Sequence, residues 1–396
     1  MADIVAATTA PSVLDTTGGG EAPGIVVDRL PLGQRIKWGF LAYAWTGLMR
    51  LILFFKESKK RFTPRADNDP DLVKSYAALK SLPIRIFFPT SYSPSSRDKF
   101  PTLLTVHGGG FVVGTPHDND TWNRIFARTH NFLVIALNYS KAPASPFPGA
   151  IHDLGTLIPL VLTDASLPID TERVALGGFS AGGNLTLTAA QLPGVRGRIA
   201  AAVPLYPVVD FVAPEGAKVR TRRYKPALGG FRARERDFLL SMMPIFNWSY
   251  LSPGLRRDDP LLSPFYADPD HLPPNIFAVA CEMDLLAPEV LRMMCKLAGR
   301  RVPGLEEVIG QEGSIRKGEL ITEGDDRFSW EEKTRDGRRY KWLLVPDTIH
   351  GFDNDGINDL ARDPVLMEDA RMKRGKVIKL IGEWLLDGPL KEKDGA

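Results

Sequence analysis

Residues 173–192 read RVALGGFSAGGNLTLTAAQL, and this stretch decides the fold. A short apolar run typical of a buried strand leads into GFSAG at 178–182, and a pattern typical of a helix follows. A serine flanked by glycines at a strand-to-helix turn indicates a nucleophile elbow, because so sharp a turn needs neighbours without side chains. Glycine-flanked serines also occur in ordinary turns and in phosphate loops. The strand before Ser180 and the helix after it favour the nucleophile.

Short apolar runs alternate with helical patterns along most of the chain from Pro83 onward. Representative runs are FPTLLTVH (100–107), NFLVIALNY (131–139) and KWLLVPD (341–347). Nearly continuous apolar strands separated by helices indicate a mostly parallel sheet that is covered on both faces. The sequence therefore predicts an α/β fold with a doubly wound sheet.

Composition narrows the class of partner and the compartment. The 396 residues carry 50 Lys and Arg against 47 Asp and Glu, so the net charge of +3 gives no global field for a polyanion. We therefore expect no nucleic-acid partner. The only two cysteines, Cys281 and Cys295, are too few for a disulfide framework and are not spaced like metal ligands. We therefore expect a reducing, cytoplasmic location, and we expect both thiols to be buried.

Four regions depart from the rhythm of the sheet. We expect residues 1–28 to be disordered and 29–75 to form N-terminal cap helices, with the catalytic domain over 76–396. An aromatic- and Met-rich insertion at about 211–259 is expected to complete the cap over a pocket; helices with a small core of their own are the alternative. Dense charge of both signs at about 302–340 predicts a solvated excursion, in the form of a hairpin, outside the core.

The segment WGFLAYAWTGLMRLILFF (38–55) reaches the lower length limit of a membrane span. Arg50 lies within it, and a charge near the middle of a span costs about 3 kcal/mol. We therefore favour a helix packed on the rest of the protein. A helix at a membrane surface and a spanning helix stay as alternatives.

A glycine run upstream of the elbow supplies the second half of an oxyanion site. HGGGF (107–111) ends an apolar strand, and consecutive glycines expose backbone N–H groups without obstruction by side chains. Gly108 and Gly109 are the expected donors, together with Ala181 at the start of the helix after Ser180. His107 precedes the serine in the chain, and we expect its ring to hold the loop.

A serine nucleophile needs a base and a carboxylate that orients it. Of six histidines, His350 follows a late strand, at the edge where open α/β sheets gather their sites. The preceding strand ends in CEMD (281–284), which offers Glu282 and Asp284 as the carboxylate. We favour Asp284, because it lies on the turn that follows the strand.

Five ordered blocks resemble the hormone-sensitive-lipase-like branch of α/β-hydrolases, which includes microbial esterases and plant gibberellin receptors. The resemblance spans roughly Pro83 to Leu386. The blocks are HGGGF (107–111), NYSKAPASPFPGAIHD (138–153), GFSAGGN (178–184), DPLLSPFYAD (259–268) and HGF (350–352). The resemblance implies an α/β-hydrolase fold with a helical cap, a triad of Ser180, Asp284 and His350, and oxyanion donors at Gly108, Gly109 and Ala181.

The chain departs from the family pattern at several places. Phe179 stands where many members carry an acidic residue, the excursion before His350 is long, and the apolar N-terminus is unusual. Phe179 has no firm account from the sequence. The long excursion predicts that the loop carrying the base moves or contacts a partner.

The expected activity is hydrolysis of a carboxylic ester through an acyl-serine, without metal or organic cofactor. The expected partner is a small, apolar or bulky ester, contacted by Phe111, Phe179, Met242 and Phe246. An acyltransferase or cyclase that uses the same acyl-serine is the alternative. A non-catalytic receptor is disfavoured, because gibberellin receptors lack the histidine that is present here as His350. The oligomeric state stays open, with a homodimer as one option.

Overall fold

The structure, a computed structural model, describes residues 26–60 and 63–392. Of the segment expected to be disordered, 1–28, residues 1–25 lie outside the described residues. Residues 26–28 are held, because Val26 forms an isolated antiparallel bridge with Arg256 and the Val27 amide donates to the Leu255 carbonyl at 2.8 Å. The described chain therefore begins with a short strand-like contact to the cap.

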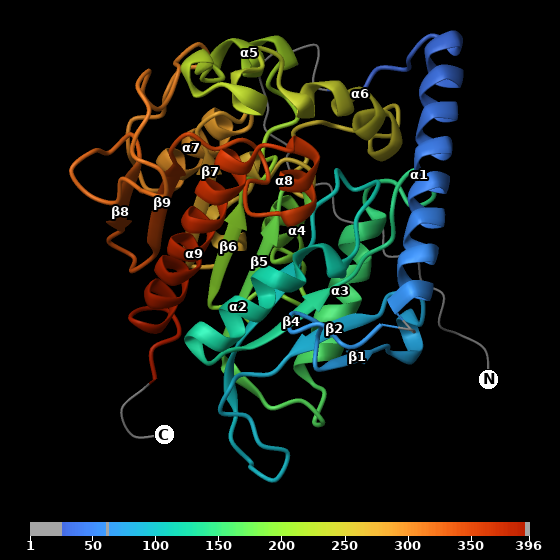
Figure 1. The fold of residues 1–396 in the computed structure, drawn as a ribbon, viewed down its shortest axis with the longest axis vertical. Coiled ribbons are helices and arrows are strands. Elements are labelled where there is room, and N and C mark those ends of the chain that lie inside the picture. Colours follow the sequence, from blue (N-terminus) through green and yellow to red (C-terminus); the bar gives the residue numbers. More distant parts are fainter. Residues whose placement is uncertain (1–25, 61–62, 393–396) are drawn as a thin grey trace, which may run out of the picture.

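One sheet of nine strands runs through the described residues (Figure 1). In spatial order these are β1 (Leu72–Lys74), β2 (Ile84–Phe87), β4 (Leu133–Leu137), β3 (Phe100–Val106), β5 (Ile169–Phe179), β6 (Ala201–Leu205), β7 (Asn275–Cys281), β9 (Arg339–Val345) and β8 (Ser329–Lys333). The six strands from β4 to β9 are parallel, whereas β1, β2 and β8 pair antiparallel at the edges. The predicted mostly parallel α/β fold is confirmed.

Helices cover both faces of the sheet, as continuous apolar strands require. Along β4, Leu133, Ile135 and Leu137 pack in the same core cluster as α3 (Gly149–Leu162) and α4 (Ala181–Ala189). Val134 and Ala136 point to the other face and pack with α2 (Asp120–His130) and α9 (Pro364–Leu386). Further along the first face, α7 (Ala287–Leu297) covers β7 and β9.

The cap lies above the carboxyl edge of the parallel strands (Figure 1). Its insertion contains α5 (Glu215–Thr221), two short 3₁₀ helices (Pro226–Leu228 and Gly230–Ala233) and α6 (Phe238–Tyr250), close to the expected 211–259. The expectation of several cap helices over 29–75 is wrong. One long helix, α1 (Leu32–Lys60), stands along the side of the molecule, and β1 of the same region joins the sheet.

Helix α1 is two-sided. Trp45 packs against Phe246 of α6 with ring centroids 5.6 Å apart, and Ala42 is fully buried. The opposite side exposes large apolar side chains, with Phe40 at 73% and Leu32 at 67%, joined by Ile36, Leu51 and Phe55. In the part of the chain that the structure describes, no helix has an apolar stretch long enough to cross a bilayer.

The charge-rich region 302–340 is not a detached excursion. Only its last part, from Ser329, forms the expected hairpin, in which β8 pairs antiparallel with β9. The expectation that it stays outside the core is wrong, because Phe328 is fully buried and Trp330 and Ile309 are almost so, in one cluster with β7 and β9. In the sequence these few apolar residues stand among many charged ones, so the pattern does not indicate that they belong to the core.

Candidate active site

Ser180 occupies a strained turn between β5 and α4. Its φ of 55° and ψ of −117° lie outside the regions that a residue with a side chain prefers, at a cost of order 1–3 kcal/mol. The glycines on either side allow the turn: a Cβ on Gly178 would lie 2.3 Å from the Gly182 carbonyl oxygen, and one on Gly182 would lie 2.1 Å from the Val106 oxygen. The backbone therefore has the geometry of the predicted elbow.

The structure brings Ser180, His350 and Asp284 into one hydrogen-bonded chain. His350 Nε2 lies 2.7 Å from Ser180 Oγ, and His350 Nδ1 lies 2.7 Å from Asp284 Oδ2. His350 and Asp284 are 4% and 1% exposed, so the contact between them is shielded from water, whereas Ser180 is partly exposed. Asp284 and His350 come from the turns after the neighbouring parallel strands β7 and β9, which explains their proximity.

The charge of Asp284 sets the protonation of the imidazole. Burial by itself lowers the pKa of His350, but the Asp284 carboxylate outweighs it through its charge and its hydrogen bond, and the pKa is raised above 6.5. A neutral imidazole with its proton on Nδ1, facing Asp284, leaves Nε2 free to accept the serine proton.

Glu282, the other candidate for the carboxylate, points elsewhere. Its Oε2 lies 2.7 Å from the ammonium of Lys225, and its Oε1 accepts the Gln311 amide at 2.8 Å. The choice of Asp284 made from the sequence therefore agrees with the hydrogen-bond pattern around His350.

Tyr206 and Asp353, which sequence reasoning did not single out, complete the surroundings of His350. The Tyr206 ring lies edge-on to the imidazole with centroids 5.0 Å apart, and its hydroxyl donates to Asp353 Oδ1 at 2.5 Å. Burial raises the pKa of Asp353 to about 6, against the lowering effect of the Tyr206 hydrogen bond. Asp353 belongs to the HGFD run at 350–353, which was the available signal.

The HGGG loop lies against the elbow. A Cβ on Gly108 would lie 3.3 Å from Ser180 Cβ, and Gly109 has a φ of +110°, where a Cβ would lie 2.2 Å from the Val113 oxygen. Ala181 is the first residue of α4, where a backbone N–H has no acceptor within the helix. The predicted donors therefore come from two segments that meet at Ser180.

His107 holds the HGGG loop in place through a hydrogen bond and a ring contact. Its Nδ1 lies 2.8 Å from the Gly108 oxygen, and its ring stacks on Tyr139 with centroids 4.4 Å apart. The Tyr139 hydroxyl also donates to the Gly108 oxygen at 3.3 Å. Burial holds the pKa of His107 well below its usual range, so its ring is neutral and fits the structural role expected of it.

A cavity of about 740 Å³, including solvent at its mouth, opens beside Ser180. Two of the four predicted contact residues, Phe111 and Phe246, line it. Its walls are mostly apolar, formed by Phe111, Val208, Phe211, Ala213, Pro214, Leu239, Met243, Phe246, Tyr250 and Leu286. Glu215, Lys218, Asn247 and Arg257 are its polar members.

Two predicted contact residues do not line this cavity. Phe179 is 3% exposed, and its ring lies edge-on to Trp122 of α2 at 5.2 Å, so it fills the core beneath the elbow. Met242 borders a different hollow, with Phe238 and Ile349, because it lies on another side of α6. Its neighbour Met243 faces the cavity instead. The expectation that Phe179 and Met242 contact the substrate is therefore corrected, because neither lines the cavity beside Ser180.

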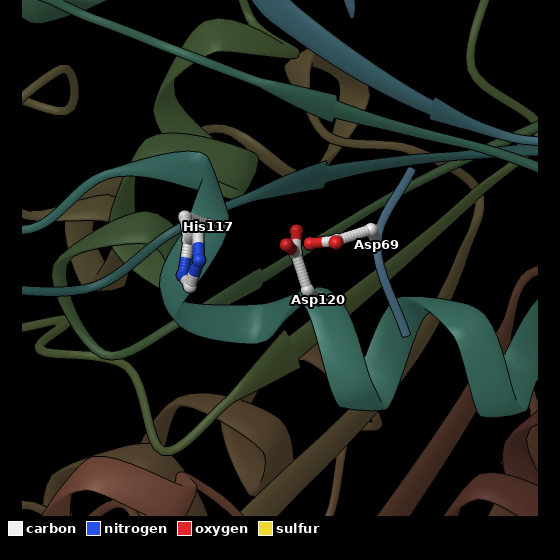
Figure 2. A group of neighbouring side chains, drawn as sticks. All are labelled: Asp69, His117 and Asp120. Atoms are coloured by element: carbon white, nitrogen blue, oxygen red, sulfur yellow. The ribbon is translucent and has the colours of Figure 1, made fainter. Parts of the chain in front are cut away.

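A group of Asp69, His117 and Asp120 has ligand atoms within 4.8 Å of one another (Figure 2). Arg85 already neutralises Asp120 through its Nε at 2.8 Å and a second, parallel hydrogen bond. Asp69 accepts the Ala66 amide at 2.8 Å. Because a guanidinium supplies positive charge here, the group gives no reason to assign a metal ion.

The sheet order, the strained serine turn and the hydrogen-bonded chain behind it define an α/β-hydrolase. A family profile described as the alpha/beta hydrolase fold matches residues 103–311, more than half of the chain. An arylesterase from Saccharolobus solfataricus is 30% identical over 230 residues, covering 57% of this chain and 69% of that enzyme. The chain belongs to the hormone-sensitive-lipase-like family of α/β-hydrolases.

Other relatives match over shorter stretches. The carboxylesterase NlhH of Mycobacterium tuberculosis is 34% identical over 118 residues, which is 30% of this chain and 36% of that protein. Among solved structures, a hyperthermophilic esterase from Pyrobaculum calidifontis has 21% identity and a TM-score of 0.54, covering 89% of this chain and all of that one. A thermostable carboxylesterase from a metagenomic library has 22% identity and a TM-score of 0.55, covering 83% and 96%. These two structures share the fold.

Proposed function

We propose that this protein hydrolyses carboxylic esters through an acyl-serine. The chain of 2.7 Å contacts from Ser180 through His350 to Asp284 carries the proposal. Ser180 Oγ attacks the ester carbonyl as His350 Nε2 takes its proton, and His350 then returns that proton to the leaving alcohol. Water then attacks the acyl-serine while His350 Nε2 takes a proton from it, and His350 returns that proton to Ser180 Oγ as the carboxylic acid leaves. Asp284 fixes the imidazole tautomer and stabilises its charged form.

Backbone N–H groups of Gly108, Gly109 and Ala181 are proposed to hold the carbonyl oxygen as it gains negative charge. The position of Gly108 against Ser180 and the place of Ala181 at the start of α4 support this assignment. Losing one such donor typically costs about 3–4 kcal/mol of transition-state stabilisation. The mechanism needs no metal or organic cofactor.

The walls of the cavity favour a bulky, mostly apolar ester. Apolar side chains form most of the lining next to Ser180, and Glu215, Asn247 and Arg257 are among its polar residues. These three residues also line a second hollow between α1 and α6, together with Trp38, Tyr43 and Trp248. The two hollows are therefore adjacent, and we propose that a large substrate extends from the first into the second.

The decisive experiment combines a fluorophosphonate label with hydrolysis of short and medium p-nitrophenyl esters. The wild-type protein should be labelled and should release p-nitrophenol, whereas Ser180→Ala should lose the label and at least about 10³-fold in rate. Equal labelling of both proteins would exclude Ser180 as the nucleophile.

The same experiment separates the alternatives. Labelling with negligible hydrolysis would favour an acyltransferase or cyclase, because both form the acyl-serine but pass it to an acceptor other than water. Neither labelling nor hydrolysis would favour a receptor. The intact Ser180–His350 contact argues against that outcome.

We also propose that the exposed apolar side of α1, within 38–55, contacts a membrane surface. Phe40 and Phe55 are 73% and 61% exposed on this side, and Arg35, Lys37 and Arg50 lie on the same helix. Flotation with anionic vesicles should recover the wild-type protein, and Phe40→Glu should reduce the recovery. Equal recovery of both proteins would contradict the proposal.

The location in the cell remains a separate proposal. Cys281 and Cys295 are both free and buried, which is the state expected of thiols in a reducing compartment. We therefore keep the cytoplasm as the proposed location.

A further inference from the structure

A buried ionic cluster joins the cap to the turns that follow β7 and β9. At its centre is Lys225, a residue of the cap insertion whose side chain is 2% exposed. Its Nζ lies 2.7 Å from Glu282 Oε2, 2.6 Å from Asp347 Oδ1 and 2.8 Å from the Gly313 carbonyl oxygen. These acceptors use all three N–H groups of the ammonium.

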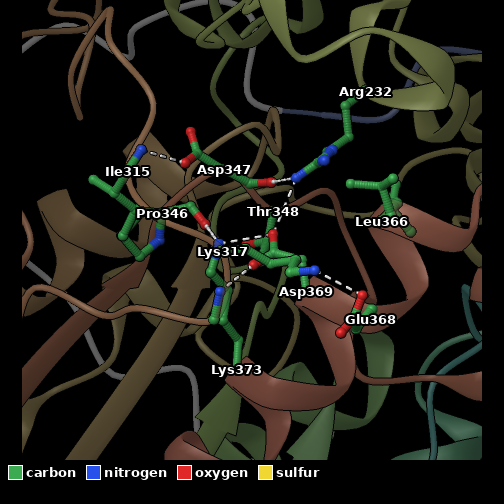
Figure 3. Close-up of polar contacts among 12 residues, drawn as sticks. Arg232, Ile315, Lys317, Pro346, Asp347, Thr348, Leu366, Glu368, Asp369 and Lys373 are labelled. Carbon is green, nitrogen blue, oxygen red and sulfur yellow. Dashed lines mark hydrogen bonds and ion pairs between the residues drawn. The ribbon is translucent and has the colours of Figure 1, made fainter.

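Backbone amides satisfy the remaining carboxylate oxygens of the cluster. Glu282 Oε2 also accepts the Asp347 amide, and Glu282 Oε1 accepts the Gln311 amide, both at 2.8 Å. Asp347 Oδ2 accepts the Ile315 amide at 2.8 Å (Figure 3). Burying two carboxylates with one ammonium is tolerated only with such complete pairing. The charge-rich region 302–340 therefore closes the cluster with its backbone.

The two carboxylates stand close in sequence to the proposed acid and base. Glu282 directly follows β7 and precedes Asp284 by two residues, while Asp347 follows β9 and precedes His350 by three. Asp347 also has a φ of +57°, an unfavourable region for a residue with a side chain. Its bonds to Lys225 and to the Ile315 amide help to hold that turn.

We propose that Lys225 is a positioning residue: by linking Glu282 and Asp347, it holds the turns of Asp284 and His350 at the spacing their hydrogen bond requires. The inference rests on the proposed function, because it gives this spacing a catalytic purpose. A misplacement of about 1 Å at a reacting group can cost roughly 100-fold in rate.

Other cap residues contact these turns one at a time. Arg222 Nε donates to the Met283 oxygen at 2.9 Å, on the acid side. Arg232 Nη1 lies 3.4 Å from the Asp347 oxygen and 3.0 Å from Asp369 Oδ2, on the base side (Figure 3). Lys225 differs because it contacts a side chain from each turn. Without it, two buried carboxylates would face each other with no cation between them.

Lys225→Met is the direct test, because it removes the ammonium and keeps the apolar stem. We expect kcat for p-nitrophenyl ester hydrolysis to fall roughly 10- to 100-fold while KM changes less than about threefold. The far-downfield proton resonance of His350 Nδ1–H, assigned by its loss in His350→Ala, should shift or broaden. Wild-type kcat with an unchanged resonance would overturn the proposal.

Arg85→Met is the matched control. It also removes a cation from a buried carboxylate, Asp120, but at β2, on the opposite side of β4 from the elbow. It should lower the melting temperature and leave both kcat and the His350 resonance unchanged. If Arg85→Met changed both as much as Lys225→Met, the effect at Lys225 would be general destabilisation, and the proposal would fall.

A double variant covers the case in which Lys225→Met does not fold. Adding Glu282→Gln removes one of the two facing charges, so the double variant should fold but keep the low kcat. Wild-type kcat in the double variant, or its failure to fold, would overturn the proposal. The resonance needs no substrate, so the positioning can be judged even if wild-type protein hydrolyses no ester and the proposed function fails.

Discussion

The Asp284 carboxylate lies 2.7 Å from His350 Nδ1, whereas Glu282, two residues earlier, faces Lys225. The two carboxylates at the end of β7 therefore have different surroundings, although both are about 1% exposed. One can orient the base directly, and the other can act only through the turn on which both lie.

Asp284→Asn should reduce kcat about 10⁴-fold, because the amide favours the wrong imidazole tautomer. Glu282→Gln should cost no more than about tenfold, since it weakens the Lys225 link but leaves the Asp284–His350 contact in place. Steady-state hydrolysis of p-nitrophenyl esters by the two purified variants measures both effects. The reverse ordering would reassign the acid to Glu282.

The pH dependence of kcat/KM should report His350. The base works when neutral, so activity should rise with pH and its acid limb should have a midpoint above 6.5, where the Asp284 charge places the pKa of His350. In Asp284→Asn the largest influence on this pKa is burial, which lowers it, and only the smaller effects of Asp237 and Asp353 oppose that lowering. The midpoint of the residual activity should then move to lower pH, and a midpoint that stays in place would contradict the role of Asp284.

Neighbouring methionines on α6 test the wall of the cavity. Met243→Ala should widen the space beside Ser180 and change the ratio of kcat/KM between medium and short acyl esters by roughly tenfold. Met242→Ala, which borders the other hollow, should leave this ratio unchanged. If only Met242→Ala altered the chain-length preference, the wall assigned here to Met243 would be wrong.

Phe328 tests the contribution of the charge-rich region to stability. Phe328→Ala should lower the free energy of unfolding by roughly 3–5 kcal/mol, because the ring is fully buried in the cluster with β7 and β9. Arg335→Ala, at an exposed position of the same region, should change it by less than about 0.5 kcal/mol. Denaturant unfolding followed by fluorescence measures both. Similar values for the two variants would mean that the hairpin folds apart from the core.

The proposed reaction centre could be predicted from the sequence, because short local segments determine its geometry. The turn around Ser180 needs glycines, the HGGG loop needs exposed amides, and His350 had to follow a late strand. Each of these requirements can be recognised from a few neighbouring residues in the sequence. The parallel sheet was likewise visible, because each buried strand is a continuous apolar run.

Contacts between distant segments were not visible. The position of Phe179 is explained by a contact between its ring and Trp122 of α2, which lies in a distant part of the sequence. The choice of Met242 instead of Met243 was an error of one residue, which is 100° around a helix. Lys225 finds its partners 57 and 122 positions away, and one lysine in a charged stretch gives no sign of this.

Phe246 of α6 touches Trp45 on one side, and its ring occupies the space that a side chain at Gly110 would need on the other. Helix α1 thus supports a wall of the cavity beside Ser180 from outside the hydrolase sheet. Shortened versions of this protein that begin after residue 60 would keep every residue of the proposed triad and still lack that support. Screens for substrates or inhibitors that use such versions would report on a different, more open enzyme.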